Sequence, residues 1–377
     1  MVALKESVFS KDISGKAGEA MEKKRVVVGM SGGVDSSVCA LLLQQQGYET
    51  DGATLRLFNN EDIGVSNTRT CCSLEDVMDA RTVCYKLGIR HYVFNFGEQF
   101  KEQVINRFAK SYEMGETPNP CIECNKYIKF AKMLERAKLL DYDYIATGHY
   151  VQREVDSNGR VLIKKAVDGR KDQTYVLYVL TQDMLRHTFF PLGAMTKEQS
   201  RALAEEHNLV NARKPDSQDI CFIKDGDYAV FLENTMGVHT PQGDFVYKDG
   251  TVLGRHKGII HYTIGQRKGL GISYRHPIFV LDKNPDNNVV TLGENSDLFT
   301  NTLTATDLNW IAIDAPKSDV KVTAKTRYSQ KEAPATIHPV DNDKVVVEFD
   351  QPQRAITKGQ AVVFYDGEYV VGGGTIR

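Results

Sequence analysis

A short glycine- and serine-rich segment between an apolar strand and an apolar helix constrains this 377-residue chain more than any other feature. The segment Gly29–Ser37 reads GMSGGVDSS and follows a β-branched run at Arg25–Val28. The helix after it is expected to begin near Ser37 and to stop at Gly47. Successive small residues let several backbone N–H groups point at one anion, and a helix N-terminus adds partial positive charge. The pattern therefore predicts a phosphate-binding loop rather than an ordinary glycine-rich turn. It is not a Walker A loop, because no lysine follows the glycines.

Strands and helices alternate through the first 150 residues. Further strands are expected at 53–58, 92–96 and 144–147. Helices are expected after Ser73 as the capping residue, then up to about residue 114, and at 126–139. This alternation predicts an α/β fold with a doubly wound parallel sheet and helices on both faces. Gly148 and His149 follow the last of these strands, at the sheet edge where such folds bind ligands.

The second half of the chain has a different pattern. A hairpin is expected at 151–165, and Thr196 with Gln199 predicts a capping box that starts a helix. From Gly237 onward the chain is rich in turn residues. Beyond about Thr300 short β-branched runs recur, which predicts a small C-terminal β-barrel or sandwich.

Composition limits the class of protein. Hydrophobic residues make up 41% of the chain and charged residues 25%, and no apolar run approaches the roughly 18 residues of a membrane helix. Seven cysteines without an apolar leader favour a cytoplasmic chain with reduced thiols. Residues 1–20 are polar and aperiodic, so we interpret them as a tag or disordered arm before a native start at Met21.

Three cysteines are candidates for chemistry. Cys121 and Cys124 lie in a predicted loop that leads into a helix, where a thiol has a lowered pKa. Cys221 is a second, distant candidate. A metal half-site is the alternative, although no second CxxC completes a zinc pattern. The other four are expected to be poor metal partners (Cys71, Cys72) or core residues (Cys39, Cys84).

A basic stretch stands out against a formal net charge of -2. Residues 253–276 contain no Asp or Glu, and their five Lys and Arg residues are Arg255, Lys257, Arg267, Lys268 and Arg275. Such a local excess of positive charge predicts either a solvated loop or a surface for nucleic-acid phosphates.

Several segments carry a resemblance to known families. The loop SGGVDSS resembles that of the PP-loop ATP pyrophosphatases, which bind the pyrophosphate of ATP, usually with Mg²⁺, and transfer AMP to a substrate oxygen. Together with it, six further segments resemble bacterial tRNA-specific 2-thiouridylases. In chain order they are TPNPCIECNKYIKF, YIATGHY, KDQTY, DSQDICFI, HYTIGQRKGLGI and PQRAITKGQAVVFYDGE.

This resemblance implies a domain plan and a reaction. The plan is a PP-loop catalytic domain at 21–225, a small central domain at 226–296 and a C-terminal β-barrel at 297–377. The reaction is ATP-dependent adenylation of the C2 oxygen of the wobble uridine in tRNA, followed by sulfur transfer from a persulfide. Its products are 2-thiouridine, AMP and pyrophosphate. The implied partners are tRNA and a persulfide donor protein, with ATP and Mg²⁺ and no membrane.

The resemblance also implies roles for individual residues. Cys124 matches the family's nucleophile and Cys221 its persulfide carrier, and the two would form a transient disulfide. The implied ATP-binding positions are Gly29, Met30, Ser31, Gly32, Gly33, Val34, Asp35, Ser36, Leu55 and Gly148. The implied contacts to tRNA or its target base are Asn119, Pro120, Cys121, His149, Lys171, Asp172, Gln173, Arg327, Tyr328 and Gln360.

One position departs from the family, and two other functions stay open. Many members have Asp where this chain has Cys121, and a thiol does not replace a carboxylate in acid–base chemistry. A different PP-loop ligase that forms AMP, such as an NAD or GMP synthetase, would need no reactive cysteine pair. An iron–sulfur or redox protein would use Cys121, Cys124 and Cys221 as cluster ligands.

Overall fold

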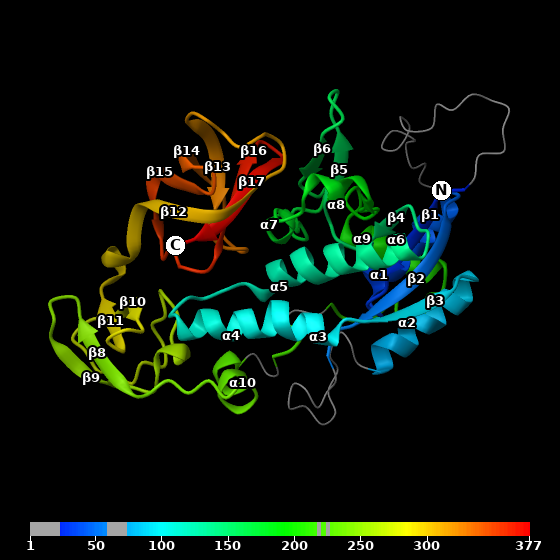
Figure 1. Ribbon diagram of the computed structural model, residues 1–377. Coiled ribbons are helices and arrows are strands. Elements are labelled where there is room, and N and C mark those ends of the chain that lie inside the picture. The colour runs from blue at the N-terminus through cyan, green and yellow to red at the C-terminus, as the bar shows by residue number, and fades with distance from the viewer. Residues whose placement is uncertain (1–22, 59–73, 217–219, 224–226) are drawn as a thin grey trace.

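The computed structural model describes residues 23–58, 74–216, 220–223 and 227–377 (Figure 1). The expected tag at 1–20, the capping residue Ser73 and the pair Cys71 and Cys72 lie outside these ranges. None of the helices in the described ranges is long and apolar enough to cross a membrane.

The N-terminal part is built on a parallel five-stranded sheet with the order β3-β2-β1-β4-β7. The strands β1 to β4 were expected from sequence, although β2 begins four residues earlier than predicted. The core strand β1 has three fully buried valines, which explains its central place in the sheet. Strand bounds are β1 (Arg25–Gly29), β2 (Glu49–Arg56), β3 (His91–Asn95), β4 (Tyr144–Ala146) and β7 (Thr188–Phe189).

Helices cover both faces of this sheet, as the alternation predicted. Two of them are long composite helices with a wider π-helical stretch in the middle, and they run side by side across the molecule (Figure 1). The first comprises α3 (Gly97–Phe100), η2 (Lys101–Ile105) and α4 (Asn106–Glu113). The second comprises α5 (Pro120–Glu123), η3 (Cys124–Lys132) and α6 (Met133–Leu139). The others are α1 (Val34–Gln45), α2 (Leu74–Leu87), α7 (Thr174–Leu177), α8 (Gln182–Arg186) and α9 (Lys197–Glu206).

Two helix starts differ from the sequence prediction. Helix α1 begins at Val34 rather than near Ser37, so Asp35 and Ser36 lie in its first turn. The second composite helix begins at Pro120 rather than Lys126. Cys121 and Cys124 therefore belong to a helix and not to a loop.

The middle of the chain forms a separate four-stranded sheet with the order β10-β11-β8-β9. A buried cluster that includes Phe245, Tyr262 and Val280 fills its core. Its elements are α10 (Tyr228–Asn234), β8 (Gly243–Tyr247), β9 (Val252–His256), η5 (Ile259–His261), β10 (Phe279–Asn284), β11 (Val289–Gly293) and η6 (Asn295–Leu298).

The C-terminal part is a closed β-barrel, as expected. Its strands follow the order β12-β15-β14-β13-β16-β17, and β12 pairs with β17 to close it. The predicted hairpin, β5 (Gln152–Val155) and β6 (Val161–Lys164), extends the barrel sheet where Lys164 pairs with Tyr369. The barrel strands are β12 (Phe299–Trp310), β13 (Val320–Lys325), β14 (Ala333–Asp341), β15 (Lys344–Arg354), β16 (Ala361–Asp366) and β17 (Tyr369–Ile376).

Candidate functional site

The glycine-rich segment forms a tight loop between β1 and α1. The Ser31 amide and hydroxyl both contact the Ser36 hydroxyl, which itself donates to the Gly33 carbonyl at 3.0 Å. Gly32 has φ +74°, and a Cβ there would lie 2.5 Å from the Asp76 carbonyl oxygen. Only glycine fits this position, because both its backbone angle and its contact with α2 exclude a side chain.

The first turn of α1 is open to an anion. Its N-cap is Gly33, which supplies no side-chain hydrogen bond to the amides that follow. Such amides and the helix dipole together favour a phosphate group. The side chains of Met30 and Val34 are buried in the core, so only their backbone atoms face this site. Leu55, the other apolar candidate, packs against the neighbouring core cluster from strand β2.

The segment after β4 touches the phosphate loop directly. A Cβ on Gly148 would lie 2.8 Å from the Asp35 carbonyl carbon and 2.9 Å from the Ser36 amide nitrogen. Strand β1 pairs with β2 on one side and β4 on the other, so the loops after β1 and β4 diverge at this point. This is the switch point at which open α/β sheets bind ligands. The sequence predicted that each loop follows a strand of the sheet, but not that the two strands are neighbours.

The surroundings of His149 disfavour the charged form of its imidazole. Burial, aided by Lys129, holds the pKa of its imidazole well below the usual range. Nδ1 of His149 lies 2.8 Å from the Thr147 hydroxyl, and its ring packs on Phe130. At neutral pH it therefore offers a hydrogen-bonding group without a charge.

The acidic residue of the loop is paired with groups that the sequence analysis did not identify. Asp35 accepts hydrogen bonds from the Lys197 ammonium at 2.7 and 2.8 Å and from the Tyr150 hydroxyl at 2.8 Å. Lys197 also pairs with Asp216 at 2.8 Å. Lysine at the first position of a helix is electrostatically unfavourable, so its occurrence just after the Thr196 cap was a weak signal of a distant carboxylate.

The cysteine pair sits at a capped helix N-terminus. Asn119 is the N-cap, its side-chain oxygen accepting from the Cys121 amide at 3.1 Å, and Pro120 occupies the first helical position. Cys121 is exposed, whereas Cys124 is buried. The two thiols therefore face different environments although they are three residues apart.

Cys221 packs against the same extended buried cluster that contains Cys124. Cys124 is part of the large buried cluster, and Cys221 packs against that cluster while remaining partly exposed. The next residue, Phe222, anchors the segment through edge-on contacts with Phe100 and Phe108. Both cysteines thus contact one extended cluster, which also includes residues of β1 and of the barrel.

Besides Asn119 and His149, six of the residues implied for tRNA contacts have partners within the chain. Lys171 pairs with Asp216 at 2.6 Å, and Arg327 donates to the carbonyls of Ile264 and Ala355. These interactions give such side chains a structural role, with Arg327 joining the central sheet to the barrel. Of the other four residues, Asp172 accepts a hydrogen bond from the Ala166 amide and Gln173 accepts one from the Tyr150 amide. Tyr328 donates to the Asp172 carbonyl and Gln360 donates to the Thr117 carbonyl.

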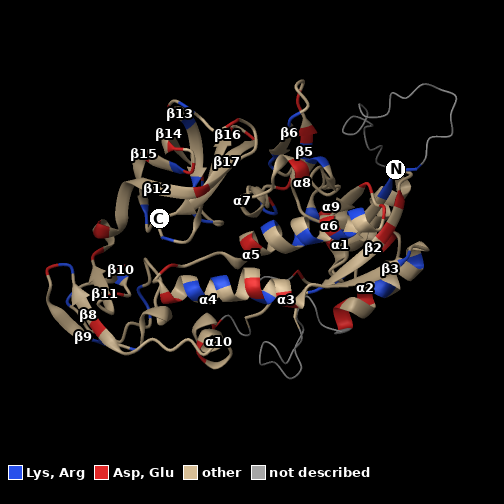
Figure 2. Ribbon diagram, in the orientation of Figure 1, with Lys and Arg blue, Asp and Glu red and all other residues tan. Residues whose placement is uncertain are grey.

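The basic stretch at 253–276 lies in the central sheet and the loop after it. Arg255 forms an ion pair with Asp244 at 2.8 Å, so it is partly neutralised. The lysines and arginines are spread along this stretch and along both composite helices (Figure 2). Arg267 and Lys268 lie between η5 and β10, next to Gly269, which has a positive φ.

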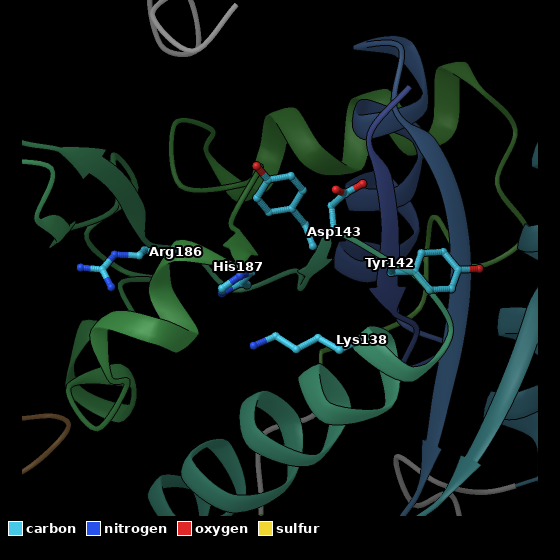
Figure 3. A pocket seen from close by; sticks show the side chains of 6 residues that line it. Lys138, Tyr142, Asp143, Arg186 and His187 are labelled. Carbon is cyan, nitrogen blue, oxygen red and sulfur yellow. The ribbon is translucent and has the colours of Figure 1, made fainter. Parts of the chain in front are cut away.

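A cavity of about 280 Å³ lies elsewhere (Figure 3). Lys138, Asp143 and His187 are among its lining residues. Asp143 precedes β4 and binds the first amide of β1, so this cavity is at the amino end of the sheet. It is opposite the phosphate loop and is not the nucleotide site.

Within the described ranges, no group of three or more His, Cys, Asp or Glu side chains is arranged to hold a metal ion. Cys121, Cys124 and Cys221 therefore do not form a ligand set there, and the cluster alternative gains no support. The phosphate loop does fit a polyphosphate, because its amides and Lys197 provide positive charge.

Comparison with known proteins covers almost the whole chain. Three family models match: a tRNA methyl transferase HUP domain at 24–225, a tRNA methyl transferase PRC-barrel domain at 229–294 and an aminomethyltransferase beta-barrel domain at 300–376. Three relatives are curated as tRNA-specific 2-thiouridylase MnmA, the third as MnmA 1. The relative from Clostridioides difficile is 53% identical over 94% of this chain and 98% of its own length. The relative from Acetivibrio thermocellus is 52% identical over 95% of this chain and 100% of its own length. The relative from Thermoanaerobacter sp. is 53% identical over 94% of this chain and 98% of its own length.

Proposed function

The chain belongs to the family of tRNA-specific 2-thiouridylases, and from this premise we propose how its residues carry out the reaction. It is a tRNA-uridine 2-sulfurtransferase that uses ATP. The observation that carries the proposal is the pairing of an uncapped phosphate loop with two cysteines on one core cluster. A PP-loop ligase without sulfur chemistry would need the first feature but not the second.

The first step activates the uridine. The C2 oxygen of the base attacks the α-phosphorus of ATP, the bond to the pyrophosphate breaks, and an adenylated uridine forms. The amides of the first turn of α1 bind the phosphates and stabilise the charge of the departing pyrophosphate. Mg²⁺ enters as part of the Mg-ATP substrate, since Lys197 and Tyr150 already engage the Asp35 carboxylate.

The second step transfers sulfur. The terminal sulfur of a Cys221 persulfide attacks C2, and AMP leaves with the electron pair of the C2–O bond. The Cys124 thiolate then attacks Sγ of Cys221, which forms a disulfide and releases the 2-thiouridine. A dithiol or thiol reductant restores both cysteines, as suits a reducing compartment. The sulfur itself comes from a persulfide donor protein.

The tRNA partner must present its wobble base out of the stack. We place the base near Asn119, Cys121 and His149, because these residues lie at the cysteine helix start and the loop after β4. A neutral His149 suits contact with an uncharged base. Cys121 replaces the family's Asp, so this site offers no carboxylate at that position for proton transfer.

Mass spectrometry of wobble uridine tests the proposal. We expect tRNA incubated with the protein, Mg-ATP and a persulfide donor to gain 2-thiouridine, and the mass distinguishes thiolation from methylation. Cys124→Ser and Cys221→Ser should both abolish it, but only Cys221→Ser should fail to accept labelled sulfur. Cys84→Ala is the control, because burial raises the pKa of Cys84 to about 12 and keeps its thiol inert. Equal sulfur loading on Cys221→Ser and wild type would refute the assigned roles.

A further inference from the structure

A buried asparagine from far along the chain contacts the phosphate loop. Asn211, in the segment after α9, is only 3% exposed. Its Nδ2 donates to the Gly32 carbonyl and contacts the Ser37 hydroxyl, both at 2.9 Å. These partners lie 179 and 174 positions earlier in the sequence. Asn211 therefore ties the loop and the first turn of α1 to the chain that follows α9.

The partners of Asn211 fix the orientation of its side-chain amide. The Gly32 carbonyl can only accept a hydrogen bond, so the amino group and not the oxygen of Asn211 lies against it. The Ser37 hydroxyl donates to the Gly33 carbonyl at 3.1 Å, which leaves its oxygen able to accept from Asn211. In the described part of the chain, Oδ1 of Asn211 is buried without a hydrogen-bond partner. The side chain thus acts on the loop only as a donor.

A loop that binds an anion through its amides needs its carbonyl oxygens turned away from that anion. The Gly33 carbonyl accepts from the hydroxyls of Ser36 and Ser37 at 3.0 and 3.1 Å, so residues of α1 hold it. The Gly32 carbonyl is held by Asn211, a residue outside both the loop and α1. Both glycine carbonyls are therefore occupied by donors of the protein.

The peptide between Gly32 and Gly33 is the unit that Asn211 controls. It is a trans peptide, so its carbonyl and its N–H point in opposite directions. The Gly33 N–H points to the exposed Ser31 hydroxyl, at a long donor–acceptor distance of 3.4 Å. A phosphate oxygen is a stronger partner for this N–H than a distant hydroxyl. Since glycine permits rotations that other residues do not, an unheld peptide can rotate and aim its carbonyl at the phosphates.

The segment that carries Asn211 is anchored by its neighbours. Ala212 is buried in the core cluster that contains residues of β1 and α1. Lys214 pairs with Asp76 and Asp79 of α2, each at 2.6 Å, and its amide donates to the Asn211 carbonyl at 3.0 Å. Contacts of the protein alone therefore place the Asn211 side chain against the loop.

We propose that Asn211 is a positioning residue for the phosphates of the nucleotide. It holds the Gly32–Gly33 peptide in the orientation that presents an N–H group and turns the carbonyl away. It acts through this peptide and has no contact of its own with the phosphates. The inference rests on the proposed function, in which the loop binds the phosphates of ATP.

Calorimetric titration of the full chain with Mg-pyrophosphate tests this role, because pyrophosphate supplies the phosphates without the nucleoside. Asn211→Asp keeps the shape of the side chain but replaces the donor with an acceptor. We expect its affinity for Mg-pyrophosphate to fall at least about tenfold, since the Gly32 carbonyl loses its partner. Asn211→Ala removes the same donor without burying a carboxylate, so it should show a loss in the same direction.

Asn309→Asp is the matched control. In the barrel strand β12, the Asn309 side chain donates to the carbonyls of Tyr178 and Leu180 at 2.6 and 3.0 Å. The same substitution there also replaces a donor to backbone carbonyls, so it should lower the free energy of unfolding in urea. Its affinity for Mg-pyrophosphate should stay as in wild type.

Kinetics separate positioning from loss of folded protein. In release of pyrophosphate with tRNA, Asn211→Asp should raise the KM for ATP and leave the KM for tRNA unchanged. A smaller folded fraction would instead lower the rate at every ATP concentration and change neither KM. Wild-type affinity for Mg-pyrophosphate in a folded Asn211→Asp or Asn211→Ala variant would overturn the inference while leaving the proposed function intact. A wild-type protein that binds no Mg-pyrophosphate would refute the phosphate-loop assignment of the proposed function, and this inference with it.

Discussion

At the scale of single residues, Gly148 shows how a missing side chain builds the nucleotide site. Gly148→Ala would place a methyl group 2.8 Å from the Asp35 carbonyl carbon, which is backbone and cannot rotate away. We expect the loop after β4 to move away from α1 and ATP affinity to fall at least about tenfold, which corresponds to 1.4 kcal/mol. Isothermal titration calorimetry with Mg-ATP measures this change.

Gly169→Ala is the control for that substitution. Nothing lies within 4 Å of a Cβ at Gly169, so the same chemical change there should leave ATP affinity as in wild type. Circular dichroism of both variants shows whether they are folded. Unchanged ATP affinity in a folded Gly148→Ala variant would mean that the close approach does not shape the site.

At the scale of elements, the cap of the cysteine helix connects stability to chemistry. Asn119→Ala removes the acceptor for the Cys121 amide, and loss of an N-cap costs about 1 kcal/mol. We expect a matching fall in the free energy of unfolding, measured by urea denaturation, and slower thiolation because Cys124 lies in the next turn. Thr181→Ala removes a cap from α8, where the side chain accepts from the Met184 amide, and should cost similar stability without slowing thiolation. Equal thiolation rates in the Asn119→Ala and Thr181→Ala variants would show that the Asn119 cap does not contribute to the reaction.

Local sequence patterns predicted most elements but misplaced two helix starts. The valines of β1 and the Thr196–Gln199 box signal their elements within a few residues. The helix start at Pro120 was not predicted, although Asn119 is a typical N-cap residue and proline is typical of the first helical position. The glycines before Val34 suggested a loop that continues to about Ser37. Gly33 instead serves as the N-cap, so the helix begins at Val34.

At the scale of the whole molecule, tRNA binding has to arise from local charge, since the net charge is -2. Arg267→Ala with Lys268→Ala should lower tRNA affinity and reduce the slope of log affinity against log salt by about two, one for each lost phosphate contact. ATP affinity should not change, because the loop belongs to the central sheet. Filter binding from low to high salt measures the slope.

The control for this experiment is Arg255→Ala. Arg255 already pairs with Asp244 at 2.8 Å, so its removal should change the salt slope less. Superimposable salt curves for wild type and the double variant would identify the stretch as a solvated loop. The tRNA surface would then have to be sought along the basic helix α5–η3–α6.

The site was predictable only in its local parts. The phosphate loop and the loop after β4 carry their own short motifs, so the sequence predicted that each follows a strand of the sheet. The pairing of Asp35 with Lys197 joins residues 162 positions apart and leaves almost no local pattern. The same holds for the bonds of Arg327 that join the central sheet to the barrel, while its implied tRNA contact stays a prediction.

The hairpin β5–β6 has a consequence for synthesis on the ribosome. The ladder between strand β6 and its barrel neighbour β17 has the pair Lys164 and Tyr369, two residues about 200 positions apart in the chain. At roughly 5–20 residues per second, the ribosome needs tens of seconds to supply that partner. During this interval one strand edge of the nascent N-terminal part stays uncovered, and such edges invite pairing with other chains. Lys164 lies on this uncovered edge strand and pairs with Glu154 within the hairpin, so charge at the edge makes premature association between nascent chains unfavourable.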